Sequence, residues 1–431
     1  MMLWSLKGYT MSKYSKVNSW THFDPLKQVV IGNIYDPKFF DDLPDTSIRD
    51  SIQKVMYETI EDLDIIKKKL IDLGVEVIQT DSKWTQNGNI LKENSFMEWQ
   101  ENNPNGSLPK PMINPRDNYI TMGDEIFLTD GFSLHCKETG EHPLDMFDCN
   151  ITLCKDMFSN YVLNKIHDVP TMLGPFTPQL EGQFENGVPN SWEPSWDVQE
   201  YFEANIKKHP IEFSKFLWST WQMSAASLTR LGDKLIVDEV DKSGFFDWYT
   251  KQRPDTKYKK ATCAIGGHTD GSMCLVRPGL IIGSPWMKED FFNKTFPGWD
   301  CMIIENPNDF ASTKDYAKLV EDQYNRKIKK RERINWFVKE KMHDHKFVKF
   351  VDQWLYDWVG MQDETLFEVN MLSLDEKNIL TLNYQTEVHD KLKSANVNPI
   401  YVPFRHKRFW DSGLHCLTLD TYREGECREI N

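Results

Sequence analysis

The sequence predicts an α/β protein in which short pairs of strands alternate with helices. A predicted strand at residues 28–31 is followed by a helical pattern at residues 47–73 and by a second strand at residues 75–78. Apolar residues recur in the helical segment every three or four positions, which is the spacing of one face of an α-helix. We expect Gly74 to end this helix, because glycine accepts the left-handed conformation found after a helix C-terminus.

Hairpin sequences of similar form recur along the rest of the chain. In the clearest of them, Pro278 and Gly279 separate two apolar runs, and proline followed by glycine is typical of a type II turn. Each such module begins with a polar residue at the start of a strand, so modules arranged radially would point these residues at one centre. Including the N-terminal strand pair, there are about five modules, at residues 20–32, 115–128, 224–237, 268–283 and 368–382.

Length and charge narrow the class of protein. The chain has 431 residues, of which 40% are hydrophobic, and it can therefore form a large core. We expect an N-terminal tail at residues 1–16 and a single domain at residues 17–431, with a helical insertion at about residues 308–362. The charged part of that insertion, residues 308–349, is typical of a solvated helix face. The formal net charge of -14 argues against a nucleic-acid partner, since phosphate binding needs a basic surface.

The sequence also bears on location. No apolar run approaches the roughly 18 residues that a membrane span needs, and residues 1–16 lack the apolar core of a secretory signal. The eight cysteines include no Cys-x-x-Cys pair and are sparse for this length, which indicates reduced thiols. The sequence therefore predicts a cytoplasmic protein without a membrane partner, and it leaves open whether the chain forms a homo-oligomer.

The module at residues 268–283 carries the first candidate chemistry. His268 and Asp270 follow two glycines and precede a buried strand, and in an extended segment residues two apart point to the same side. We therefore expect both side chains to face one pocket. The alternatives are a hydrogen-bonded structural histidine and a carboxylate that caps the turn. A metal site made by His268, Asp270 and His415 is disfavoured, because no spacing matches a zinc or non-haem iron motif, and we expect no metal and no cofactor.

Cys416 is the candidate nucleophile near the C-terminus. It starts a short predicted strand after a loop that contains Gly413, and the basic segment at residues 405–408 lies shortly before it. Nearby positive charge lowers the pKa of a thiol and makes it a better nucleophile at neutral pH, which is what we expect here. The alternative is a plain core residue, since cysteine is among the most often buried residue types.

Several short segments, in order along the chain, resemble those of the amidinotransferases of the glycine amidinotransferase type. This family belongs to the superfamily of guanidino-group-modifying proteins with the pentein fold. The resemblance runs from about residue 17 to residue 423. It rests on Asp24-Pro25-Leu26, Pro115-Arg116-Asp117, His268-Thr269-Asp270, Asn370-Met371-Leu372 and Gly413-Leu414-His415-Cys416.

The resemblance implies a fold and a set of catalytic roles. The fold would be a five-bladed α/β propeller of ββαβ modules with its site on the pseudo-fivefold axis, which agrees with the modules above. Cys416 would be the nucleophile and His268 the general acid and base, while Asp117 and Asp270 would hold the guanidinium. Paired carboxylates suit that planar cation because they bind it through charge-assisted, bidentate hydrogen bonds.

The resemblance further implies that Arg405, Asn370 and Glu368 bind substrate. The residue that orients the catalytic histidine in the family is an acid, and the corresponding segment here begins with Ser224 and ends with Ser227. Ser224 is then the candidate orienting residue, because a hydroxyl can accept a hydrogen bond from imidazole even though it carries no charge.

The activity implied is transfer of an amidino group from arginine, or a related guanidino donor, to a primary amine. Both would be small-molecule partners, and the intermediate would be a covalent amidino-cysteine. Two alternatives stay open at this point. One is a guanidino hydrolase or deiminase on the same scaffold, and the other is a guanidino-binding protein without catalysis, for which the two serines in place of acids are the motivation.

Overall fold

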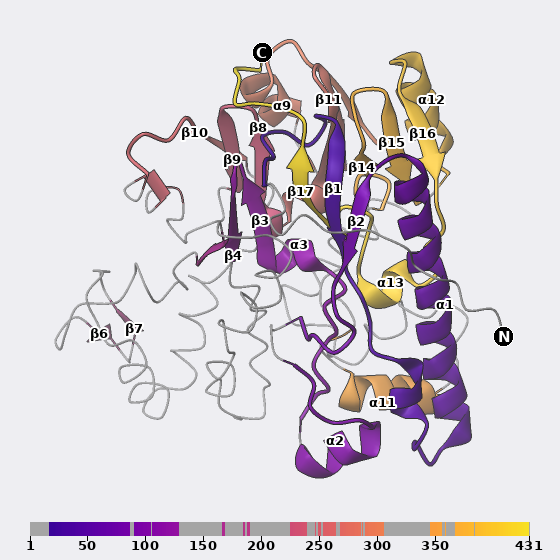
Figure 1. The fold of residues 1–431 in the computed structure, drawn as a ribbon. Helices are drawn as coiled ribbons and strands as arrows, with labels where there is room; N and C mark the ends of the chain where they lie inside the picture. The colour runs from indigo at the N-terminus through magenta and orange to yellow at the C-terminus, as the bar shows by residue number, and fades with distance from the viewer. Residues whose placement is uncertain are drawn as a thin grey trace, which may run out of the picture.

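The fold is known from a computed structural model. Figure 1 shows strands gathered side by side at the middle of the molecule, with one long helix along their edge. The structure describes residues 17–86, 90–104, 106–128, 166–168, 184–185, 188–189, 225–238, 246, 249–250, 253–263, 268–285, 287, 289–305, 345–355, 358, 367–382 and 384–430. The predicted tail at residues 1–16 and most of the charged segment at residues 308–349 lie outside these ranges.

Five three-stranded sheets within the described residues share one pattern. In each, the central strand pairs antiparallel with one edge strand and parallel with the other. We name each sheet by its central strand. The β1 sheet is β17 (Thr418–Arg423), β1 (Leu26–Ile31) and β2 (Glu76–Gln79), and the β4 sheet is β3 (Tyr119–Met122), β4 (Glu125–Leu128) and β5 (Ile166–Asp168). The β9 sheet is β8 (Leu228–Leu231), β9 (Lys234–Asp238) and β10 (Lys259–Cys263). The β12 sheet is β11 (Met273–Arg277), β12 (Leu280–Gly283) and β13 (Asp300–Ile303), and the β15 sheet is β14 (Leu372–Ser373), β15 (Asn378–Thr381) and β16 (Asn398–Tyr401).

Helices connect the parallel strands, as such crossovers require. They are α1 (Thr46–Asp72) between β1 and β2, α9 (Glu289–Thr295) between β12 and β13, and α12 (Thr386–Ser394) between β15 and β16. α1 confirms the predicted helix. The Asp45 carboxylate caps its first turn by accepting from two backbone N–H groups, and Gly74 follows its end at φ +83°. The α/β class predicted from the sequence is therefore correct.

The predicted hairpin turns are confirmed where glycines take positive φ. Gly279 has φ +79° between β11 and β12, and Gly123 and Gly232 have φ +61° and +63° in the β3–β4 and β8–β9 turns. The N-terminal module differs from the prediction. Its antiparallel partner is β17 from the other end of the chain, with Ile31 opposite Thr418. A local pattern could not show this pairing, since nearly the whole chain lies between the two strands.

Hydrophobic clusters lie between consecutive sheets. Strand residues alternate between two faces, so Ile281 packs toward the β9 sheet while its neighbour Ile282 packs toward the β15 sheet. This explains why the strands read as continuous apolar runs. The clusters join the β1 and β4 sheets (Val30, Tyr119), the β4 and β9 sheets (Phe127, Leu235), the β9 and β12 sheets (Ile236, Ile281), the β12 and β15 sheets (Ile282, Ile379), and the β15 and β1 sheets (Leu380, Val29).

Smaller elements complete the described residues. The polar segment at residues 82–114, predicted as a long loop, contains the helix α2 (Phe96–Asn102), whose Ser95 cap accepts from the Glu98 N–H at 3.3 Å. α11 (His345–Trp354) lies in the segment predicted to be an insertion and contacts α1. Other short elements are η1 (Pro37–Phe40), the hairpin of β6 (Phe184–Glu185) and β7 (Val188–Pro189), and α13 (Lys407–Trp410). Among the helices described, none is long and apolar enough to cross a membrane.

A buried ion cluster ties three of the sheets together. The Asp420 carboxylate on β17 accepts from Arg230 Nη2 on both oxygens, at 2.9 and 2.8 Å, and from Arg423 Nε at 2.5 Å. Arg116 Nη2 and the Ser19 hydroxyl also donate to it. All three guanidiniums and the carboxylate are buried. Burial alone would raise the pKa of Asp420, but the three arginines hold it well below its ordinary value.

The Asp420 cluster generates a prediction about stability. Asp420→Asn leaves three buried guanidiniums without a counter-charge, and we expect it to destabilise the fold by about 3–5 kcal/mol. Urea unfolding followed by circular dichroism measures the effect. Asp72→Asn is the control, because it breaks only an exposed pair with Lys68 and should leave the unfolding midpoint nearly unchanged. Equal midpoints for the two variants would contradict the central role of Asp420.

Candidate active site

Five short turns carry or adjoin the predicted site residues Asp117, His268, Asp270, Glu368, Asn370 and Cys416. Four of the turns stand directly before the edge strand that pairs antiparallel in their sheet, and the turn at residues 367–369 stands two residues before it, so the five turns lie at corresponding positions of the five sheets. They are α3 (Pro115–Asn118) before β3, η3 (Ala225–Ser227) before β8, α8 (Thr269–Ser272) before β11, a turn at residues 367–369 before β14, and a turn at residues 414–417 before β17.

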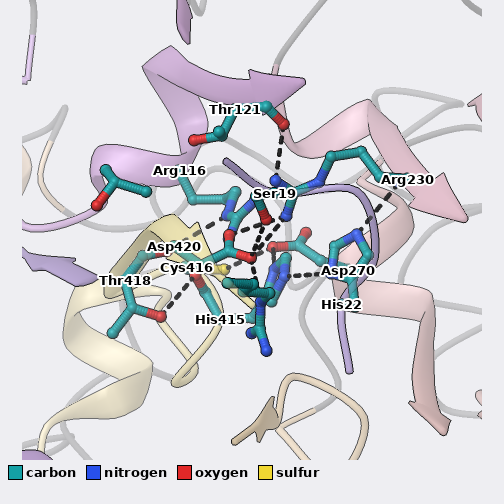
Figure 2. Close-up of polar contacts among 12 residues, drawn as sticks. Ser19, His22, Arg116, Thr121, Arg230, Asp270, His415, Cys416, Thr418 and Asp420 are labelled. Atoms are coloured by element: carbon teal, nitrogen blue, oxygen red, sulfur yellow. Dashed lines mark hydrogen bonds and ion pairs between the residues drawn. The ribbon is translucent and has the colours of Figure 1, made fainter. Parts of the chain in front are cut away.

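Hydrogen bonds join these turns. The Thr269 hydroxyl donates to the Ala226 carbonyl at 2.8 Å, and Asn370 Nδ2 donates to the Asp270 carbonyl at 3.0 Å. Arg116 Nε donates to the Thr418 carbonyl at 3.3 Å, which links α3 to the start of β17. Figure 2 shows Arg116, Asp270, His415 and Cys416 brought together in this way from different elements.

The Cys416 sulfur lies beside Asp270 and Asn370. Its Sγ is 3.6 Å from Asp270 Oδ2 and 3.0 Å from Asn370 Nδ2, which donates to it. Asn370 Oδ1 accepts from the backbone N–H groups of His415 and Cys416, at 2.8 and 3.1 Å. All of these residues are buried. Asn370 therefore fixes the backbone on which the sulfur sits as well as the sulfur itself.

Gly413 is required by the same contact. A Cβ built on Gly413 would overlap the side chain of Asn370. Any larger residue would push Asn370 away from Cys416, which gives a physical reason for glycine in the segment that carries the family resemblance.

His268 and Asp117 complete the group that the sequence predicted. His268 is the N-cap of α8, and Asp270 lies inside that one-turn helix. The expectation that both residues lie in an extended segment was therefore wrong. Their charges are still close enough to act on one another. Burial raises the pKa of Asp117, and the charge of His268 opposes that rise. Burial would also raise the pKa of Asp270, but the hydrogen bond from His415 and the charges of His415 and His268 lower it.

The electrostatics of Cys416 differ from the prediction. Burial and the negative charges of Asp270 and Asp117 raise the pKa of the Cys416 thiol well above its ordinary value. The basic segment does not lower it. The Arg405 guanidinium donates to Asp62 on α1, with Nε 3.1 Å from both carboxylate oxygens, and to Glu61 at 2.7 Å. These contacts hold Arg405 against α1, and none of its contacts in the described residues brings it to Cys416.

Of the other residues that the sequence pointed to, Glu368 and Ser227 lie in the described part of the chain. Glu368 is buried in the turn next to Asn370, on the same segment that contacts the cysteine. Ser227 is buried at the end of η3. Ser224 lies outside the described residues.

Two histidines that the sequence did not single out as site residues also belong to this group. His415 Nδ1 lies 2.7 Å from Asp270 Oδ2, and His415 Nε2 lies 3.0 Å from His22 Nδ1. The position of His415 next to Cys416 was a usable signal, but it was considered only as a metal ligand. His22 could not be found by pattern, because 393 positions separate it from His415. Within the described residues, no group of three or more His, Cys, Asp or Glu side chains could hold a metal ion.

Comparison with known proteins gives the fold. No protein-family model matches the chain, and no curated protein matches its sequence. Similar solved structures include SxtG, an amidinotransferase of the saxitoxin biosynthetic pathway of Microseira wollei. It has a TM-score of 0.53 and 16% identity, over 96% of this chain and 99% of that chain. Inosamine-phosphate amidinotransferase StrB1 from Streptomyces griseus has a TM-score of 0.52 and 16% identity, over the same shares of each chain. The chain therefore has the α/β fold of these two solved structures.

The electrostatics of Cys416 give a second prediction. Asp117→Asn removes one of the charges that raise the thiol pKa, so alkylation of Cys416 by iodoacetamide should begin at lower pH than in the wild type. Peptide mass spectrometry across a pH series measures this, with Asp124→Asn as the control because Asp124 is exposed at the β3–β4 turn. An unchanged or higher midpoint in Asp117→Asn would show that Asp117 does not act on the sulfur.

Proposed function

We propose that this protein is an amidinotransferase that works through a covalent amidino group on Cys416. The observation that carries the proposal is the placement of a buried thiol 3.6 Å from the carboxylate of Asp270, with Asp117 also acting on it. A thiol between carboxylates is suited to a substrate that is a flat cation with an electrophilic carbon. The donor would be arginine or a related guanidino compound, and the acceptor a primary amine.

The two carboxylates explain how the sulfur becomes reactive. Without a ligand they disfavour the thiolate, and a guanidinium bound between them offsets their charge. The thiol pKa then falls only when the donor is in place, which confines the nucleophile to the occupied site. The carboxylates also hold the cation through charge-assisted hydrogen bonds and so orient its central carbon toward Sγ.

The transfer would take place in two steps. The sulfur adds to the guanidinium carbon, and the thiol proton passes through His268 to the departing nitrogen. That nitrogen leaves as a neutral amine, which is ornithine when the donor is arginine. The amidino group remains on sulfur as an S-alkylisothiouronium cation. The acceptor amine, deprotonated by His268, then adds to the same carbon and expels Cys416. Burial of the sulfur favours transfer because it limits the access of water, which would give hydrolysis instead.

The architecture that fits this site is a five-bladed propeller with the cysteine on its axis. Each sheet would be one blade. The hydrophobic clusters that join consecutive sheets, and that also join the β15 sheet back to the β1 sheet, support this arrangement. In the same proposal Glu368 and Asn370 bind substrate from their own blade, and Ser224 orients His268. Arg405 is left out of the substrate set because α1 holds its guanidinium.

The proposal predicts a covalent intermediate. When the protein is mixed with arginine and no acceptor, intact mass spectrometry should show a gain of one amidino group, located at Cys416 by peptide mapping, with one ornithine released per site. Cys416→Ala should show neither. Cys274→Ala is the matched control, because Cys274 is a buried core thiol on β11 and its loss should leave the adduct in place.

The behaviour of that adduct separates transfer from hydrolysis. Addition of a primary amine should discharge the adduct to a new guanidino product, whereas steady release of urea or ammonia without any amine would identify a hydrolase. If a panel of guanidino donors, including arginine, gives neither adduct nor free amine, the chain does not carry out this chemistry. Arginine binding that survives Cys416→Ala would then identify a guanidino-binding protein.

His268 gives a further prediction. His268→Asn removes the proton carrier but preserves a small polar side chain at the α8 N-cap. We expect kcat to fall by about 10²- to 10⁴-fold, as is usual when a general acid–base is lost, with a much smaller change in arginine affinity. Stopped-flow release of ornithine measures the first quantity and calorimetry with Cys416→Ala and the double variant measures the second. A kcat within about threefold of wild type would exclude His268 from proton transfer.

A further inference from the structure

A chain of hydrogen bonds runs from the backbone of β8 to the Asp270 carboxylate. The Arg230 N–H lies 3.3 Å from His22 Nε2, His22 Nδ1 lies 3.0 Å from His415 Nε2, and His415 Nδ1 lies 2.7 Å from Asp270 Oδ2. The two imidazole rings are 4.9 Å apart between centroids. Figure 2 shows His22 and His415 in this order beside Asp270.

The groups at the two ends of this chain of hydrogen bonds fix its direction. A backbone N–H can only donate, so His22 Nε2 is the acceptor, and a neutral His22 then carries its proton on Nδ1. That proton is donated to His415 Nε2. His415 in turn carries its proton on Nδ1 and donates it to Asp270 Oδ2. The carboxylate can only accept, so both ends favour the same direction, and each imidazole is held in a single tautomer.

The surroundings keep both rings neutral. Burial lowers the pKa of both histidines, with Arg230 adding to the effect at His22 and Arg116 at His415. Asp420 opposes these cations at both rings, and Asp270 does so at His415. Neutral imidazole has one donor and one acceptor, so two neutral rings can form consecutive hydrogen bonds that all point the same way. Two protonated rings could not do this, because each has only donors.

This chain of hydrogen bonds leaves one oxygen of the Asp270 carboxylate available. Asp270 Oδ2 receives the His415 bond and faces the Cys416 sulfur at 3.6 Å. Asp270 Oδ1 is buried and has no hydrogen-bond partner among the described residues. A buried carboxylate oxygen without a partner is costly unless a ligand supplies a donor. The bond from His415 thus occupies Oδ2 and leaves Oδ1 for a cation.

A small cavity lies beside the two histidines. His22, His415 and Asp270 line this cavity of about 20 Å³ together with Thr229, Cys274 and Ser373. This volume fits about one water molecule. Within the described residues, His22 reaches Asp270 through His415.

We propose that His22 is a positioning residue of the cysteine site, which acts through His415 to hold the Asp270 carboxylate with Oδ1 directed at a guanidinium ligand. The inference rests on the function proposed above for its ligand class. It assigns a role to a residue of the N-terminal segment that is far from Cys416 in sequence and does not contact substrate.

The test compares His22→Leu with His22→Asn. Leucine has no donor, so His415 Nε2 loses its partner and the ring is held by Asp270 alone. Asparagine places an N–H close to the position of His22 Nδ1 and should preserve the orientation of His415. We expect arginine affinity in a Cys416→Ser background to fall about ten- to a hundredfold for His22→Leu, the loss usual when a charged hydrogen bond or an outer partner of a site is removed. His22→Asn should restore most of it, and calorimetry measures both.

Two further measurements do not depend on substrate. In ¹⁵N spectra of histidine-labelled wild-type protein, His22 and His415 should both be neutral and protonated on Nδ1 at neutral pH. Alkylation of Cys416 by iodoacetamide should shift to higher pH in His22→Leu, because the Asp270 charge facing the sulfur is no longer compensated, and should return toward wild type in His22→Asn.

These readouts separate the two proposals. One possible result is that no amidino adduct forms, while both histidines keep the expected tautomers and His22→Leu shifts the alkylation profile. This result would overturn the proposed transfer and leave the positioning role standing. A His415 proton on Nε2 in the wild type would overturn the positioning role, even if His22→Leu failed to fold. Arginine affinity and alkylation profile both unchanged in a folded His22→Leu protein would overturn it as well.

Discussion

The structure depends on one buried carboxylate, that of Asp420, and on the three guanidiniums that surround it. Arg116 comes from α3, Arg230 from β8, and Arg423 from the same strand as Asp420, so the cluster joins the beginnings of three sheets. None of these charges can be solvated, so each must find its partner within the protein. Three of the turns that carry the site stand directly before β3, β8 and β17, and the ion cluster therefore helps to fix where Asp117 and Cys416 lie.

The charged groups that act on the Cys416 sulfur are mainly carboxylates, in contrast to the three arginines that surround Asp420. Asp117 and Asp270 raise the pKa of Cys416, and the nearby cations of the chain are already committed, Arg116 and Arg230 to Asp420 and Arg405 to α1. The described residues supply no further cation that contacts the thiol. A bound guanidinium is a natural way to complete the local charge balance, which ties binding of the donor to activation of the nucleophile in one step.

The sequence predicted correctly those features that depend on residues close together in the chain. The amphipathic spacing of α1, the Pro278–Gly279 turn and the polar residues before strands all depend on neighbours a few positions apart. It failed where the determinant is a distant contact. The pairing of β1 with β17, the bond from His22 to His415 and the capture of Arg405 by Asp62 each join segments more than 300 residues apart. The low thiol pKa predicted for Cys416 was wrong for the same reason, since adjacency in sequence to basic residues says nothing of where their side chains point.

The pairing of the two ends of the domain also explains how one site can depend on so many segments. β17 carries Asp420 and begins directly after Cys416, and its register against β1 is fixed by burial of both faces. A shift of one residue would turn Asp420 away from Arg230 and would also move the turn that holds His415 and Cys416. The segment before β1 supplies His22 and Ser19 to the same neighbourhood. Correct pairing of β17 with β1 and correct assembly of the cysteine site therefore depend on the same segments of the chain.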